Sequence, residues 1–249
     1  MSNLTIELKN ISKVYIDEFG NKLEVLKNVN ASFSKNKIYA VLAPEGSGKS
    51  TVLKIISGIE THSNGELITN NQRIVFIPAE PSSFPWLNVR DNVKEGLKVD
   101  LKELQSIINN VGLSGYEDHF PDNKSYGFRF RISLAKALAY KADFIVLDAV
   151  FNMMSAESKL ECFSLIKKLN SEGQSFILGT SNITEALFLA SEIYFLSSKP
   201  AEIINKYESA FSKENDISVT SGDNFIKSRN EIENIFKKEY SQIFAKLTI

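Results

Sequence analysis

Residues 43–51, which read Ala-Pro-Glu-Gly-Ser-Gly-Lys-Ser-Thr, combine glycines, hydroxyl side chains and one lysine in a short loop. The loop follows an apolar run, 37–42, and precedes an apolar helical pattern, 49–57. Backbone N–H groups and the helix dipole at such a turn attract anions, and glycines allow an anion to approach the backbone closely. The pattern predicts a phosphate-binding loop, in which Lys49 contacts the β- and γ-phosphates of a nucleotide and Ser50 ligates Mg²⁺. The nucleotide-binding residues expected in this loop are Ala43, Pro44, Glu45, Gly46, Ser47, Gly48, Lys49, Ser50 and Thr51.

The first position of this loop holds Ala43 where a glycine is expected. An alanine is tolerated there if its φ is negative, and costs roughly 1 kcal/mol if its φ is positive. In either case the lysine and the N–H groups of the loop are kept. The alternative is a chance Gly-Ser-Gly-Lys turn on the surface, but the preceding strand, the spacing and the following helix all favour the phosphate loop.

An acidic side chain at the end of a second strand pattern predicts the other half of a nucleotide site. The segment 143–148, Asp-Phe-Ile-Val-Leu-Asp, places Asp148 directly after a buried strand. Its carboxylate is suited to hold Mg²⁺ through water. Taken alone, Asp148 is equally explained as a turn cap, and only its pairing with the phosphate loop favours the metal site.

The order of elements predicts an α/β fold. Strand patterns at 37–42, 143–148, 175–180 and 192–197 alternate with helical patterns at 49–57, 155–169 and 184–190. Such alternation indicates a mostly parallel sheet. Residues 82–141 instead form helical patterns with Pro- and Gly-containing loops, and 212–224 are polar, as in a solvated linker. The expected domains are a core made of 1–81 and 142–200, an inserted helical subdomain at 82–141, and a C-terminal appendage at 201–249.

The composition restricts the compartment and the partners. The 249 residues carry 29 basic and 30 acidic side chains, a net charge of −1 that gives no electrostatic reason to expect nucleic acid. Cys162 is the single cysteine, which favours a reducing compartment and a core position. No apolar run approaches the roughly 18 residues of a membrane span, and the N-terminus has no signal pattern. We therefore expect a cytoplasmic protein that docks on a membrane partner.

Over about residues 4–200 the chain resembles the ATP-binding subunits of ABC transporters. The resemblance rests on the phosphate loop with its flanking segments, and on Val-Arg-Asp-Asn-Val at 89–93. The segments 120–140 and 184–200 are most similar to the nitrate/taurine/sulfonate-type importers. The resemblance implies a RecA-like P-loop NTPase core with an antiparallel N-terminal β portion and an inserted α-helical subdomain.

The resemblance also implies roles for residues outside the phosphate loop. Tyr15 matches the aromatic residue that stacks on adenine. Ser125 and Gly127 lie in the signature segment, which acts on the nucleotide of a partner subunit. The expected contacts of a membrane permease, with plain core packing as the alternative, are Phe84, Pro85 and Trp86.

Four positions depart from the family pattern in side chains that support hydrolysis. The family has glutamine, glutamate, aspartate and histidine where this chain has Ala79, Ala149, Ser155 and Ser181. The signature, Leu-Ser-Gly-Gly-Gln in the family, reads Lys-Ser-Tyr-Gly-Phe at 124–128. Groups that bind nucleotide are kept, whereas groups that activate water are missing. We therefore predict binding of MgATP with very slow hydrolysis at the chain's own site.

Several functions remain open at this point. The favoured one is a degenerate importer subunit on the inner face of the cell membrane, which forms a heterodimer with an active ATPase paralogue and binds a permease. The alternatives are a soluble regulatory or scaffold protein that binds ATP, and a weakly active ATPase homodimer. A P-loop kinase is disfavoured because it has no use for the signature-like segment 120–131.

Overall fold

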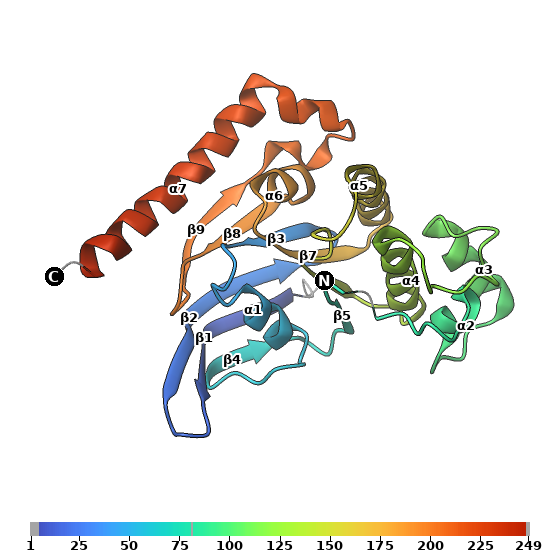
Figure 1. Cartoon of the computed structure of the whole chain (residues 1–249), viewed down its shortest axis with the longest axis horizontal. Coiled ribbons are helices and arrows are strands. Elements are labelled where there is room, and N and C mark those ends of the chain that lie inside the picture. Colours follow the sequence, from blue (N-terminus) through green and yellow to red (C-terminus); the bar gives the residue numbers. More distant parts are fainter. Residues whose placement is uncertain (1–4, 81, 248–249) are drawn as a thin grey trace.

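The computed structural model, which describes residues 5–80 and 82–247, contains a main sheet with strand order β5-β6-β7-β3-β8-β9 (Figure 1). Its neighbouring strands are parallel except for the antiparallel pair of β8 and β9. The strands are β3 (Ile38–Leu42), β5 (Ile74–Ile77), β6 (Phe144–Asp148), β7 (Ser175–Thr180), β8 (Glu192–Leu196) and β9 (Ile203–Glu208). The predicted mostly parallel sheet and its four expected strands are confirmed.

A second sheet is antiparallel, with the order β2-β1-β4. It is formed by β1 (Thr5–Ile16), β2 (Lys22–Ser34) and β4 (Asn64–Ile68). Helix α1 (Lys49–Ile56) buries Val52 and Leu53 in a core that both sheets share. The antiparallel N-terminal β portion implied by the family resemblance is therefore present.

Strand β3 is buried on both faces, which explains its uninterrupted apolar sequence. Ile38, Ala40 and Leu42 belong to the larger core, whereas Tyr39 and Val41 belong to the core shared with the second sheet. This alternation follows from the two-residue period of a strand. Because both faces are packed, the end of β3 is held rigidly, and with it the loop that begins at Ala43.

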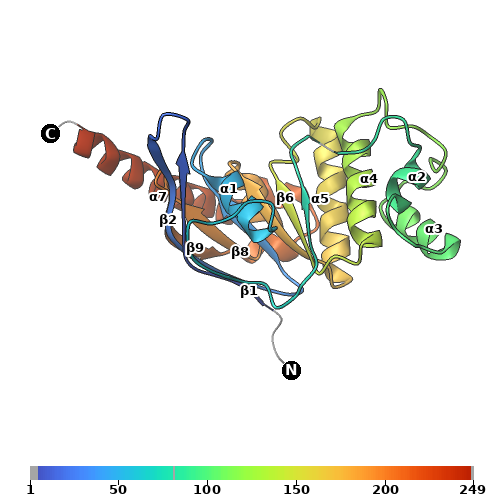
Figure 2. The same cartoon turned by 90° about the horizontal axis from the view of Figure 1, so that it is seen from below.

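Five helices of the larger core follow the expected pattern. They are α2 (Val89–Lys94), α3 (Leu101–Asn110), α4 (Tyr126–Ala139), α5 (Ala156–Ser171) and α6 (Ile183–Leu189). Figure 2 shows α2, α3 and α4 gathered beside α5, at the opposite end of the molecule from β2. Cys162 of α5 is buried, as predicted, and burial raises its pKa to about 11. The helical character of 82–141 is confirmed, while the division into domains stays a prediction.

The C-terminal segment differs from the solvated linker that its polar sequence suggests. It contains short 3-10 helices η1 (Ala210–Lys213) and η2 (Ile217–Ser221), then helix α7 (Asp223–Leu247), which runs past α6 in Figure 1. Ile217 and Val219 pack against the larger core, and the Asp216 carboxylate caps η2. A few spaced apolar residues are thus enough to hold this polar stretch against the larger core. Within 5–80 and 82–247, no helix is long and apolar enough to cross a bilayer.

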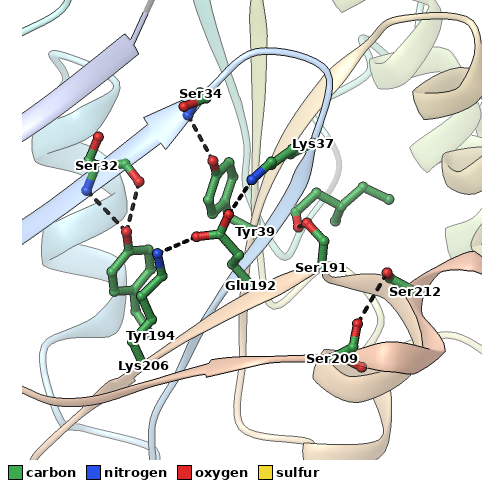
Figure 3. A network of polar contacts seen from close by, with 11 residues as sticks. Ser32, Ser34, Lys37, Tyr39, Ser191, Glu192, Tyr194, Lys206, Ser209 and Ser212 are labelled. Atoms are coloured by element: carbon green, nitrogen blue, oxygen red, sulfur yellow. Dashed lines mark hydrogen bonds and ion pairs between the residues drawn. The ribbon is translucent and has the colours of Figure 1, made fainter.

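A polar network joins β8 to β9 and to the start of β3 (Figure 3). The Glu192 carboxylate accepts hydrogen bonds from both Lys37 and Lys206. Burial alone would raise the pKa of Glu192, but these two ammonium groups outweigh it and hold the pKa below its ordinary value. The Tyr194 hydroxyl donates to the Ser32 carbonyl of β2 at 2.8 Å. The network therefore fastens the edge of the main sheet to the second sheet.

Candidate nucleotide-binding site

The phosphate loop lies where the carboxyl ends of three parallel strands meet. Leu42 of β3 pairs with Thr180 of β7, and Asp148 of β6 pairs with Gly179 of β7. Ligands of open parallel sheets bind at this edge of the sheet. The structure thus brings Asp148, from a distant part of the sequence, beside the loop that β3 feeds.

The two glycines of the loop adopt a backbone that other residues rarely adopt. Gly46 and Gly48 have φ values of 74° and 107°. A Cβ on Gly48 would also lie 2.9 Å from the Cγ1 atom of Val25. Gly48 is the N-cap of α1, and no side chain caps the first N–H groups of that helix. These N–H groups are therefore available to an anionic ligand.

Ala43 fits the loop without backbone strain. It is buried, and its φ lies outside the positive region. Its N–H donates to the Thr180 carbonyl at 3.2 Å, and its own carbonyl accepts from the Lys49 ammonium at 3.3 Å. The extra methyl group joins the core shared by the two sheets. Alanine in place of glycine at this position is therefore compatible with a phosphate-binding loop.

Lys49 and Asp148 form a buried charged pair of groups with unused bonding capacity. Lys49 is 8% exposed and Asp148 is 7% exposed. Burial holds the pKa of Lys49 below its ordinary value, although the charge of Asp148 acts in the opposite direction. The Oδ1 atom of Asp148 is buried without a hydrogen-bond partner. An anion beside Lys49 and a hydrated cation beside Asp148 would satisfy both groups, so the site fits a metal-bound phosphate.

A hollow of about 370 Å³ opens over the loop. It is lined by Pro44, Glu45, Gly46, Gly48, Lys49, Ser50, Thr51, Ala149, Asn152, Ser181 and Lys199. Sequence reasoning missed Asn152 and Lys199, because their chemistry becomes visible only when the chain brings them to the loop. It also missed Gly179, where a Cβ would lie 2.3 Å from the Leu53 Cδ1 atom, so the site leaves no room for a larger residue without movement of Leu53.

The positions expected to be degenerate are in three different settings. Ala149 and Ser181 line the hollow, and Ala149 has a left-handed backbone with a φ of 51°. Ser155 is the N-cap of α5, where its hydroxyl accepts from the Ser158 N–H at 3.2 Å. Ala79 follows β5 and is not among the described residues that line the hollow. Among those lining residues, Glu45 is the one acidic side chain.

A buried glutamate holds the segment that carries Ser181, and sequence reasoning missed it. Glu185 accepts a hydrogen bond from the Thr180 hydroxyl at 2.6 Å and lies 3.4 Å from the Lys159 ammonium. Asn182 caps α6 by accepting from the N–H groups of Thr184 and Glu185. The spacing Thr-x-Asn-x-x-Glu at 180–185 was the available signal. These bonds fix the backbone at Ser181 without adding a reactive group.

Tyr15 lies apart from the hollow, on β1 of the second sheet. Its side chain is 38% exposed, and the Lys13 ammonium lies 4.8 Å from the centre of its ring. Lys13 in turn binds the Glu60 carboxylate at 2.6 Å. The ring thus has an exposed part available for stacking, and its role toward adenine stays a prediction.

The signature segment is built around the N-terminus of α4. Ser125 is its N-cap and accepts from the Phe128 N–H at 3.2 Å. A Cβ on Gly127 would lie 2.1 Å from the Ser158 Oγ atom, so α4 and α5 pack closely there. Ser125 is exposed and lines no hollow with the chain's own Lys49. Its expected role toward a partner's nucleotide stays a prediction.

Trp86 is an exposed member of the predicted permease contact. It is 69% exposed and its ring centre lies 5.3 Å from that of Phe84. The Phe84 N–H donates to the Asn92 side chain at 2.7 Å. Asn92 also borders an apolar groove of about 320 Å³ between β5 and α4. An exposed tryptophan beside an apolar groove favours an interface over core packing at this position.

The sequence comparisons agree on one family. The family described as "ABC transporter" matches residues 26–152. The chain is 31% identical to the taurine import ATP-binding protein TauB of Shigella boydii, over 89% of this chain and 94% of that protein. It is 30% identical to the aliphatic sulfonates import ATP-binding protein SsuB of Bacillus thuringiensis, over 80% of this chain and 84% of that protein.

The fold has close counterparts among solved structures. The dimeric structure of MJ0796, a bacterial ABC transporter cassette, superimposes with a TM-score of 0.71 at 24% identity, covering 82% of this chain and 98% of that one. The fold class predicted from the sequence is thereby confirmed. By sequence and fold together, the chain belongs to the ABC transporter family, among its ATP-binding proteins.

Proposed function

We propose that the chain is the ATP-binding subunit of an ABC-type importer that binds MgATP but hydrolyses it very slowly at its own site. One observation carries the proposal: a single hollow combines Lys49, beside the unpartnered Asp148 carboxylate, with Ala149 and Ser181. The names of TauB and SsuB support an importer of the sulfonate, taurine or nitrate type.

The residues expected to bind the nucleotide are all present in the chain. The Lys49 ammonium donates to the Ala43 carbonyl of the loop and feels the charge of Asp148, and it would contact the β- and γ-phosphates. Ser50 and Asp148 would hold Mg²⁺, which supplies positive charge to the phosphates when it is bound. N–H groups of the loop and of the first turn of α1 would bind phosphate oxygens. Tyr15 would stack on adenine.

At positions 149 and 181 the hydrolysis half has no side chain that readily takes a proton from water. Alanine at 149 has no acceptor, and the Ser181 hydroxyl is a much weaker base than an imidazole or a carboxylate. Ala79 and Ser155 would not replace the missing proton acceptor. Alanine has none, and the Ser155 hydroxyl already caps α5. Loss of a positioned general base lowers a rate by about 10²–10⁴-fold. We infer turnover far below that of ordinary ATPases, ~1–10³ s⁻¹.

Such a subunit needs partners to do work. The groove beside Trp86 and Phe84 is the proposed contact of a membrane permease, which would hold the chain at the cytoplasmic face of the membrane. A second, active ATPase subunit would complete a heterodimer. In that assembly the exposed Ser125 would face the nucleotide of the active subunit.

The purified chain tests both halves of the proposal. Equilibrium titration with a fluorescent ATP analogue should show MgATP binding, and phosphate release should show almost no turnover. Turnover in the ordinary range would contradict the degenerate site, whereas low but measurable turnover by a homodimer would favour the weakly active alternative. Affinity purification from native membranes separates the remaining alternative, because co-purification of a permease supports the importer and its consistent absence supports a soluble regulator.

A further inference from the structure

A second polar hollow, of about 780 Å³, lies between the phosphate loop, α6 and α7. It shares Glu45, Asn152 and Ser181 with the hollow over the loop, so the two hollows adjoin. The lining residues that it adds include Lys159, Arg229 and Glu233. A helix from the C-terminal segment thus contributes charged side chains to the surroundings of the phosphate loop.

Helix α7 is held firmly enough to place those side chains. Phe225 and Ile232 are buried in the larger core, and Arg229 lies one turn from each, on the same side of the helix. Ahead of α7, the buried Lys167 ammonium binds the carbonyl oxygens of Phe211 and Glu214. The backbone at Arg229 is therefore fixed, while its long side chain can still move.

Among the residues that the two hollows share, Glu45 is the charged one. Glu45 is an exposed carboxylate within the phosphate loop, and it would repel the terminal phosphate of a bound nucleotide. Lys159 is already committed to the buried Glu185. Arg229 is paired at 3.1 Å with Glu233 in a surface-exposed pair of the i,i+4 type, which contributes little stability. The second hollow adds two cations, Lys159 and Arg229. Of these, Arg229 is the one whose present ion pair is weak enough for a phosphate to replace it.

We propose that Arg229 of α7 contacts the terminal phosphate of a nucleoside triphosphate bound at the phosphate loop. The guanidinium group moves from Glu233 to the phosphate, which it can bind through two parallel N–H donors. It adds positive charge opposite Glu45 at the wall that also carries Ser181. The C-terminal helix thereby makes the site select a triphosphate over a diphosphate. The inference rests on the proposed nucleotide binding at Lys49.

Competition titrations of the full chain with MgATP and MgADP test this contact. Arg229→Ala should lower the affinity for ATP about tenfold and change the affinity for ADP less than about twofold. Arg229→Lys should restore part of the loss. Lys227→Ala is the matched control, because this exposed residue lies about 200° around the same helix, and both affinities should stay at the wild-type values.

Two results would overturn the inference. An unchanged ratio of ATP to ADP affinity in Arg229→Ala would show that the side chain does not reach the terminal phosphate. An equal loss of both affinities would show that Arg229 only supports the structure. Wild-type protein that binds neither nucleotide would instead contradict the proposed function itself, so the two failures are distinguishable.

Discussion

The hollow over the phosphate loop has two sides that differ in packing and in chemical groups, a binding side and a hydrolysis side. On the binding side, Gly48 is packed against Val25, Gly179 leaves room only for its hydrogen atoms, and Lys49 is buried beside Asp148. On the hydrolysis side, Ala149 and Ser181 present a methyl group and a small hydroxyl. Their surroundings are nevertheless ordered, since Glu185 binds both Thr180 and Lys159. This contrast fits the proposal that the scaffold of the hydrolysis side is kept while its reactive groups are replaced.

This contrast separates geometry from chemistry within one site. A positively charged cradle needs backbone shape and a lysine, and small changes such as Ala43 leave it intact. Activation of water needs a specific acceptor at a specific place, and no packing can substitute for it. The predictions below change one side at a time.

The largest effect is expected from a side chain that serves the partner's site. In a verified heterodimer with an active ATPase, Ser125→Arg should lower phosphate release about 10²-fold, because it removes a hydroxyl and adds bulk at the N-terminus of α4. Ser181→Ala is the control from the chain's own hydrolysis side and should change the rate little. Undiminished turnover of the Ser125→Arg complex would refute a trans role for the signature.

Breaking the binding side should reduce affinity strongly. Lys49→Ala removes the ammonium group beside Asp148 and should weaken MgATP binding about 30-fold, or about 2 kcal/mol. Lys54→Ala, an exposed lysine of the same helix, should bind like the wild type. Equilibrium titration with a fluorescent analogue measures both. Equal affinity of the two variants would mean that the nucleotide binds elsewhere.

Repairing one position on the hydrolysis side should have a smaller effect. Ala149→Glu restores a carboxylate, but Ser181 and Ala79 stay unchanged and catalytic groups act as a unit. We expect turnover to rise less than about tenfold in steady-state phosphate release. Ala149→Gln, which has the same size without the charge, is the control. Full ATPase activity of Ala149→Glu would show that the hydrolysis side is otherwise complete.

The smallest effect concerns the segment that leads to α7. Burial lowers the pKa of Lys167 from 10.5 to about 8, so the unfolded chain binds more protons than the folded one between these values. The free energy of unfolding should therefore gain about 1 kcal/mol per pH unit above pH 8 from this residue. Urea unfolding between about pH 7.5 and about pH 9.5 measures this gain. The wild type is compared with Lys167→Met, which should lack it.

The exposed neighbour Lys168→Met is the control for that measurement and should keep the wild-type pH dependence. If Lys167→Met also keeps it, Lys167 is not the titrating group. The result bears on the comparison of the two sides. The Lys167 ammonium binds the segment that precedes α7, and α7 lines a hollow together with Ser181.

The sequence by itself determined the elements whose signals are local. The apolar runs gave β3, β6, β7 and β8 almost to the residue, because a strand buried on both faces must be apolar throughout. The glycine spacing and Lys49 likewise determined the phosphate loop, since the positive φ of Gly46 and Gly48 is a property of the residues themselves. The alanine at 149 and the serine at 181, on which the proposed slow hydrolysis rests, are also read directly from the sequence.

Only the tertiary structure decided what surrounds that loop. Gly179, Glu185 and Lys159 come from β7, α6 and α5, and their contacts depend on strand order rather than on local pattern. The polar stretch 212–224 folds onto the core because a few apolar side chains find partners there. Arg229 lines the second hollow only because α7 packs beside α6. This contact joins residues far apart in the sequence, so no local sequence pattern predicts it.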